Sequence, residues 1–135
     1  MVTQLLEAGV ITEGVLEDYY TTFLAGIFRS VRFGAASAHG KANMIRFNYF
    51  AQAGAFTRNE HGQYAVNMDA MRDAMNSLSA KILTLQGDGD YQAVGQLFST
   101  MGHIHAQLQA DLYRLAEAQI PVDITFRQGV EVLGL

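Results

Sequence analysis

The chain has 135 residues, of which 50% are apolar and 16% are charged, and its formal net charge is −4. This composition predicts a folded domain and excludes a disordered chain, because disorder requires low hydrophobicity and high charge. The acidic balance and the scattered Lys and Arg residues argue against nucleic acid and anionic membranes as partners, and the absence of cysteine excludes disulfides and thiolate metal sites.

The first half of the chain has the three-to-four-residue spacing of apolar side chains that is typical of helices. A short helix ends at Gly9, and Thr12 is expected to cap a long helix that runs to about Phe33. A further helix is predicted from Ser37 to Gln52. The runs "AFTR" and "QYAV", separated by the turn sequence "NEHG", then predict a β-hairpin.

The second half of the chain is predicted to contain three more helices. Asn67 or Asp69 caps the first of these, and Asp88 or Asp90 caps the second. The third begins after Gly102 and carries Ile, Leu, Leu and Leu on one face. The helical part is expected to end at the single proline of the chain, and an extended tail follows.

Together these elements predict an all-α fold, a helical bundle of five to six helices with one small β-hairpin, as a single domain over residues 1–135. No stretch approaches about 18 uninterrupted apolar residues, and no signal-peptide pattern is present. We therefore expect a cytoplasmic protein that contacts no membrane. The slightly positive mean hydropathy predicts an apolar surface that another domain or a second copy covers.

The four histidines raise the hypothesis of a metal site, which the spacing does not support. His103 and His105 are two residues apart, which on a helix places them about 200° apart, so that they do not chelate one ion together. His61 falls in the predicted hairpin loop, and no histidine is followed by glutamate as in zinc-peptidase helices. The run "GDGDYQAVG" lacks the glycine and the glutamate that complete a calcium loop. We expect no metal ion or other cofactor in this chain.

The segment "FGAASAHGKANMIRFNYF" carries the most unusual set of polar residues. His39, Asn43, Arg46 and Phe50 are spaced four, three and four apart, so they share one face of a helix, while Lys41 projects elsewhere. One interpretation is a polar binding strip. The other is a buried histidine capped by a backbone carbonyl beside an ordinary amphipathic helix, and spacing alone favours this second interpretation.

The runs "YYTTFLAGIFRSVRFG", "ASAHGKANMIRFNYF", "KILTLQGDGDY" and "IPVDITFRQGVEVLGL" resemble the C-terminal part of the catalytic domain of dipeptidyl peptidase III-type zinc peptidases. The resemblance implies a parent enzyme that removes dipeptides from the N-termini of short peptides. In this family, zinc is held by a His-Glu-x-x-Gly-His helix and by a glutamate of a later Glu-Glu helix. Neither a His-Glu nor a Glu-Glu pair occurs in this sequence, so the resemblance implies a fragment whose zinc belongs to the rest of the parent. Bacterial relatives can also carry a nudix-type domain or a name derived from one.

By this resemblance, His39 matches the family histidine that lies close to the substrate, and we assign it a catalytic role. Lys41, Asn43 and Arg46 are its candidate substrate-binding neighbours. Family members often place arginine four residues after the histidine, where this chain has Asn43, so Lys41 or Arg46 is expected to compensate. The basic residues that relatives use nearer the C-terminus have one weak match, Arg127.

Two functions follow as hypotheses. In the first, the chain forms one wall of the peptide-binding cleft of a zinc-dependent dipeptidyl peptidase III-like enzyme and is inactive alone, with the rest of its parent and a short peptide substrate as partners. In the second, it is a non-catalytic helical interaction or oligomerisation module of a larger protein. In either case, the isolated chain is expected to form a homodimer through its exposed apolar face.

Overall fold

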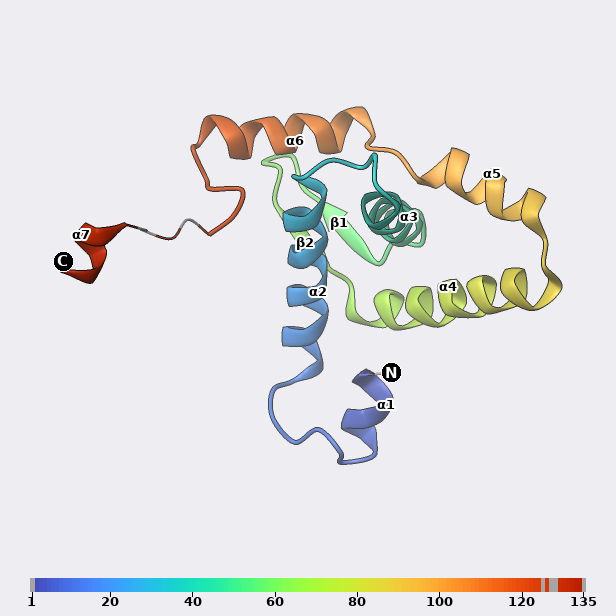
Figure 1. The fold of residues 1–135 in the computed structure, drawn as a ribbon. Helices are drawn as coiled ribbons and strands as arrows, with labels where there is room; N and C mark the ends of the chain where they lie inside the picture. The colour runs from blue at the N-terminus through green and yellow to red at the C-terminus, as the bar shows by residue number, and fades with distance from the viewer. Residues whose placement is uncertain (1, 125, 127–128, 135) are drawn as a thin grey trace.

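The computed structural model describes residues 2–124, 126 and 129–134. Within these residues the elements are α1 (Val2–Glu7), α2 (Leu16–Val31), α3 (Ala38–Gln52), β1 (Phe56–Arg58), β2 (Tyr64–Val66), α4 (Met68–Asp88), α5 (Tyr91–Met101), α6 (Ala106–Glu117) and α7 (Val130–Leu133). The predicted all-α fold with one hairpin is confirmed. In Figure 1, α2 runs vertically, α4 lies horizontally beside it, α6 lies horizontally above its upper end, and α3 points along the line of sight.

The core lies between α2 and α3, which contact each other more extensively than any other pair of helices. The buried apolar side chains of α2 are Tyr20, Leu24, Ile27 and Val31, and those of α3 are Met44, Ile45, Phe47 and Phe50. Phe47 contacts the rings of Phe28 and Phe56 at centroid distances of 5.4 and 4.9 Å. Because Phe56 belongs to β1, this aromatic cluster fixes the hairpin to the two central helices.

Side-chain caps start α3, α4 and α5, and the caps of α4 and α5 are among the residues predicted for them. Ser37, Asn67 and Asp90 each accept a hydrogen bond from the backbone N–H three residues further on, at 3.1, 3.2 and 2.9 Å. These bonds satisfy amide groups that have no partner within the helix. Asn67 and Asp90, rather than Asp69 and Asp88, are therefore the caps of α4 and α5.

The predicted start of α2 is wrong, and the helix ends at Val31, slightly before the predicted end near Phe33. Thr12 does not cap it, because Gly14 adopts a φ of 74° and the helix begins only after Val15. The backbone N–H of Val15 donates to the carboxylate of Asp18 at 3.4 Å, which replaces the expected cap. At the other end, Phe33 lies beyond the helix and is exposed.

The start of α6 and the C-terminal segment also differ from the prediction. The last long helix begins at Ala106 and not directly after Gly102, because the buried amide of Asn48 donates to the backbone carbonyls of Met101 and His103 at 2.8 and 3.0 Å and holds the segment between them in a loop. The helical part does not end at the proline either, since the short α7 follows and lies away from the other helices in Figure 1. The predicted extended tail includes Thr125, which lies outside the described residues.

None of the described helices combines the length and the apolar character that a membrane-crossing helix needs.

Candidate functional site

The first turn of α3 is held tightly against the loop that precedes it. Ser37 caps this turn, and Gly40 is buried so close to the loop that a Cβ atom there would lie 2.5 Å from the carbonyl oxygen of Gly34. Only glycine permits this approach. His39 stands between these two anchored residues and is exposed. The interpretation of His39 as a buried, carbonyl-capped histidine is therefore wrong.

The polar residues that follow His39 are joined by hydrogen bonds. The side-chain amide of Asn43 donates to the hydroxyl oxygen of Ser30 on α2 at 2.6 Å. Its carbonyl oxygen accepts from the guanidinium of Arg46 at 3.0 Å. Both groups of the Asn43 amide are thereby used, so its orientation is fixed. We call His39, Asn43 and Arg46 the α3 strip.

The remaining two residues of the predicted segment do not join the α3 strip. Phe50 shares its face but is buried, with its ring 6.0 Å from that of Phe23 on α2, so it belongs to the core. Lys41 is exposed two residues after His39, a spacing that points its side chain to another side of the helix. The structure thus brings Asn43 and Arg46 into contact, leaves His39 exposed one helical turn before them, and separates Lys41 from all three.

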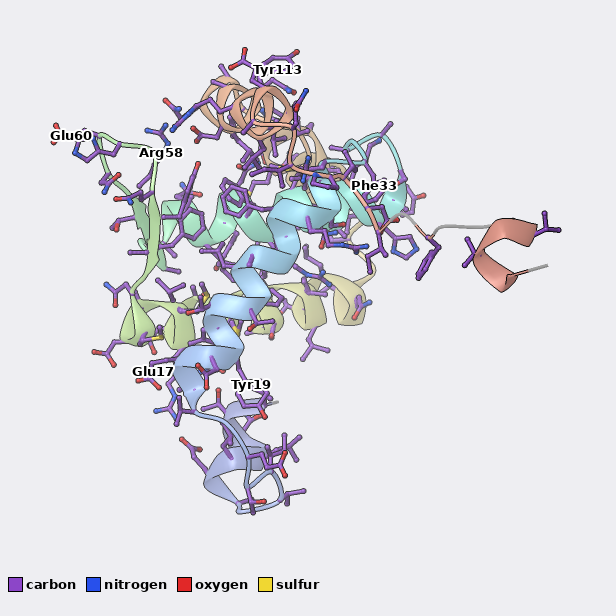
Figure 2. All side chains as sticks on the ribbon, turned by 90° about the vertical axis from the view of Figure 1, so that its left-hand side faces the viewer. Glu17, Tyr19, Phe33, Arg58, Glu60 and Tyr113 are labelled. Carbon is purple, nitrogen blue, oxygen red and sulfur yellow. The ribbon has the colours of Figure 1, made fainter. Side chains whose placement is uncertain are left out.

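A second polar cluster, which the sequence analysis missed, joins the hairpin to α6. Arg58 on β1 donates two hydrogen bonds to the carboxylate of Asp111 on α6, at 2.8 and 2.7 Å. The hydroxyl of Tyr64 on β2 donates to the same carboxylate at 2.7 Å. We call these three residues the hairpin clasp. Figure 2 shows Arg58 on the side of the hairpin near α6, whereas Glu60 lies at its outer tip.

The electrostatics of the hairpin clasp follow from these contacts. The side chain of Asp111 is only 8% exposed. The guanidinium of Arg58 nevertheless lowers the pKa of Asp111 to about 2, with a further contribution from the Tyr64 hydroxyl. Burial raises the pKa of Tyr64, and its hydrogen bond to Asp111 raises it further. In the clasp, Arg58 and Tyr64 therefore keep the carboxylate of Asp111 ionised, and the carboxylate oxygens accept their hydrogen bonds from within the fold.

One signal in the sequence indicates the hairpin clasp. Asp111 lies three residues after Leu108 and four before Leu115, so it occupies the apolar face of α6. An acidic residue on such a face needs a buried partner. The sequence does not reveal that this partner is Arg58, 53 residues earlier, because nothing local connects the two.

The geometry of His103 and His105 differs from the helical placement used in the sequence analysis. These residues lie in the loop between α5 and α6 and not on a helix, and their rings are 4.4 Å apart between centroids. Even so, residues 2–124, 126 and 129–134 contain no group of three or more His, Asp or Glu side chains placed to hold a metal ion. The donors that the structure describes therefore do not fit a zinc site of the peptidase type. Arg127 lies outside the described residues.

Comparisons with known proteins identify similar chains, although no family model matches. The chain is 39% identical over 121 residues to Nudix hydrolase 3 of Arabidopsis thaliana, which covers 90% of this chain and 16% of that protein. The structure of dipeptidyl-peptidase III from Corallococcus sp. strain EGB matches with a TM-score of 0.85 and 35% identity, over 93% of this chain and 23% of that one. DPP III from Caldithrix abyssi matches with a TM-score of 0.86 and 35% identity, over 97% of this chain and 25% of that one.

These matches extend over nearly all of the present chain but over a small share of each relative. The chain spans about a sixth of the plant protein and about a quarter of each solved structure. The two solved structures are similar to this chain both in the arrangement of their helices, as the TM-scores show, and in sequence, at 35% identity. The chain therefore has a fold like that of the matched helical part of dipeptidyl-peptidase III.

Proposed function

We propose that this chain is a helical region of a zinc-dependent dipeptidyl peptidase III-like enzyme and forms one wall of its peptide-binding cleft. The observation that carries the proposal is the exposed His39 on a rigidly anchored helix start, within a fold similar to part of dipeptidyl-peptidase III. A side chain presented this way costs little reorganisation when it meets a substrate, as a preorganised catalytic group requires.

The α3 strip and Lys41 supply the chemistry that we assign to this wall. An imidazole N–H of His39 donates a hydrogen bond to a peptide oxygen and stabilises negative charge that develops there. Arg46, oriented by Asn43, pairs with a carboxylate of the peptide, and Lys41 adds a second positive charge on the neighbouring face. His39 is thus the proposed catalytic residue, and the other three bind substrate.

Zinc in this proposal belongs to the rest of the parent protein. Since the described donors do not form a zinc site, we expect this chain alone to bind no zinc and to cleave no peptide. Its partners are then the remainder of the parent chain and a short peptide, with neither nucleic acid nor membrane involved. The proposed location is the cytoplasm.

A second candidate function rests on exposed apolar side chains. Leu83 and Tyr91 are 67% and 91% exposed near the α4–α5 turn, and Phe126 is 74% exposed in the C-terminal segment. Surfaces of this kind occur where a partner covers them. The alternative is accordingly a non-catalytic interaction module, and for both candidates we propose that the isolated chain self-associates as a homodimer.

The two candidates differ in what the full-length parent does. The test is to purify the parent and to measure release of dipeptides from the N-termini of short peptides, before and after a chelator removes bound metal. Activity that the chelator abolishes and zinc restores supports the peptidase. A parent that has no His-Glu-x-x-Gly-His motif and releases no dipeptide contradicts it and leaves the interaction module.

A further inference from the structure

An apolar groove lies beside the α3 strip. It has a volume of about 250 Å³ and is bordered by α3, α4 and α5. Its walls are mainly aliphatic and aromatic, with Ile45 from α3, Ile82 from α4 and Phe98 from α5. Ile82 and Phe98 remain 38% and 42% exposed, so part of this apolar surface is in contact with water. A ligand that covers it gains free energy from the apolar area removed from water.

Arg46 is the one cationic side chain among the described residues that line this groove. Within the part of the chain that the structure describes, it forms no ion pair with a carboxylate. Arg58 and Arg72, by contrast, are paired with Asp111 and Glu7. A positive charge beside an apolar surface is complementary to a ligand that carries both an apolar group and an anion.

The guanidinium of Arg46 is also held in place. Asn43 accepts from it at 3.0 Å, and Ser30 accepts from the Asn43 amide at 2.6 Å, so a chain of two hydrogen bonds leads from α2 to the groove. One Nη1–H of Arg46 is used in this contact, and the planar guanidinium keeps further N–H groups for a ligand. Ser30 and Asn43 act as positioning residues for this charge.

We propose that the groove binds the C-terminal end of a short peptide, with its last apolar side chains in the groove and its terminal carboxylate on Arg46. The proposal deepens the function proposed above, on which it rests, by naming the ligand class that the α3 strip selects. The groove is smaller than the pockets of about 300–1,000 Å³ that hold drug-sized ligands, which favours one or two side chains over a cofactor. A carboxylate matches the planar guanidinium better than any other group of a peptide.

The test uses the chain alone, so it does not depend on hydrolysis. A ¹⁵N-labelled sample is titrated with acetyl-Leu-Leu, which has a free carboxylate, and with acetyl-Leu-Leu-amide, which has none. We expect shift changes in α3, α4 and α5 around the groove and about fivefold tighter binding of the acid, the scale of one exposed ion pair. A third peptide, acetyl-Leu-Asp-Leu-amide, moves the carboxylate to a side chain. This peptide should bind no more tightly than the amide, and binding as tight as that of the acid would contradict the proposed chain end.

Variants separate the charge from the groove. Arg46→Gln should abolish the preference for acetyl-Leu-Leu over its amide. Arg72→Gln changes an exposed arginine on α4 that does not line the groove, and this variant should keep the preference. Ser30→Ala should reduce the preference, and Ser30→Thr, which keeps the hydroxyl, should restore it. If Arg46→Gln fails to fold, Arg46→Lys is used instead. This variant retains the charge without the planar guanidinium and should bind acetyl-Leu-Leu more weakly than the unchanged chain does.

Several outcomes overturn the proposal. Equal affinity for acid and amide, a preference that survives Arg46→Gln, or no shift at about 10 mM peptide each contradict it. Shift changes at the groove that depend only on protein concentration would place the contact of the proposed homodimer in the groove, and this outcome contradicts the peptide as its occupant. Absence of peptidase activity in the parent bears on the proposed function alone, since this binding is measured without catalysis.

Discussion

The hairpin clasp and the α3 strip are both polar, and they use their polar groups in opposite ways. In the clasp, Arg58 and Tyr64 place three hydrogen bonds on the buried carboxylate of Asp111. In the α3 strip, the backbone is anchored by Ser37, but His39 at its start is exposed to solvent. The polar groups of the clasp are used within the fold, whereas His39 and Arg46 of the α3 strip remain exposed to solvent.

From this difference we expect the clasp to contribute to stability, and under the proposed function the α3 strip contributes to binding. A buried charge with every partner in place contributes to the fold and offers little to a ligand, because a ligand would have to displace bonds already made. An exposed imidazole on a rigid helix start has the opposite character. Changes in the clasp should therefore affect unfolding, and changes at His39 should affect binding and catalysis.

The largest expected effect is on stability and comes from Asp111→Ala. Removing this carboxylate leaves Arg58 and Tyr64 without their acceptor, and because the Arg58 side chain is 26% exposed, the cost lies at or below the lower end for buried ion pairs, about 2–3 kcal/mol. Urea unfolding followed by circular dichroism measures the loss. Asp73→Ala, an exposed aspartate on α4, is the matched control and should change the free energy of unfolding little. Equal effects of the two variants would contradict the structural role of the clasp.

A somewhat smaller effect is expected from acid. The pKa of Asp111 lies near 2 in the folded chain, below its ordinary value of 3.8, so the folded state favours the ionised form. Its stabilisation is complete above about pH 4 and is lost as the pH falls toward about 2, by about 2 kcal/mol in total. Unfolding free energies measured from pH 6 to pH 2 should fall less steeply in Asp111→Asn. The exposed Asp123, whose pKa is also lowered, stays in both proteins and so cancels in this difference. Parallel pH profiles would exclude the proposed cause.

The smallest of these stability effects is expected at the start of α3. Ser37→Ala removes the hydroxyl that accepts from the backbone N–H of Gly40 at 3.1 Å and should cost about 1 kcal/mol. Ser37→Asp, which keeps an acceptor at the cap, should recover most of the loss. If alanine and aspartate behave alike in thermal unfolding, the cap does not anchor this helix start.

The sequence predicts the helices well because most of their signals are local. The spacing of Met71 and Leu78 indicates the buried face of α4, and capping residues such as Asn67 lie within three residues of the amides they bind. The misplaced start of α2 has a local cause too, the turn at Gly14, which competes with the cap predicted at Thr12.

The candidate sites were less predictable, because their decisive contacts join distant parts of the chain. The spacing of His39, Asn43 and Arg46 indicates a shared face but not the bond from Asn43 to Ser30, 13 residues earlier on another helix. Likewise, the contact of the His103 and His105 rings depends on a loop that Asn48 holds from α3. Such contacts follow from tertiary packing, which hydrophobic periodicity does not encode.

The most direct test of the central claim is kcat/KM for dipeptide release by the full-length parent, compared between the unchanged protein, His39→Ala and His61→Ala. His61 is also an exposed histidine, in the hairpin loop, and serves as the control. The account predicts that His39→Ala lowers kcat/KM about 100-fold, the effect of removing one transition-state hydrogen-bond donor, with an unchanged melting temperature and with His61→Ala fully active. A parent whose kcat/KM stays within about twofold in His39→Ala would contradict the assignment of the α3 strip to the peptide cleft.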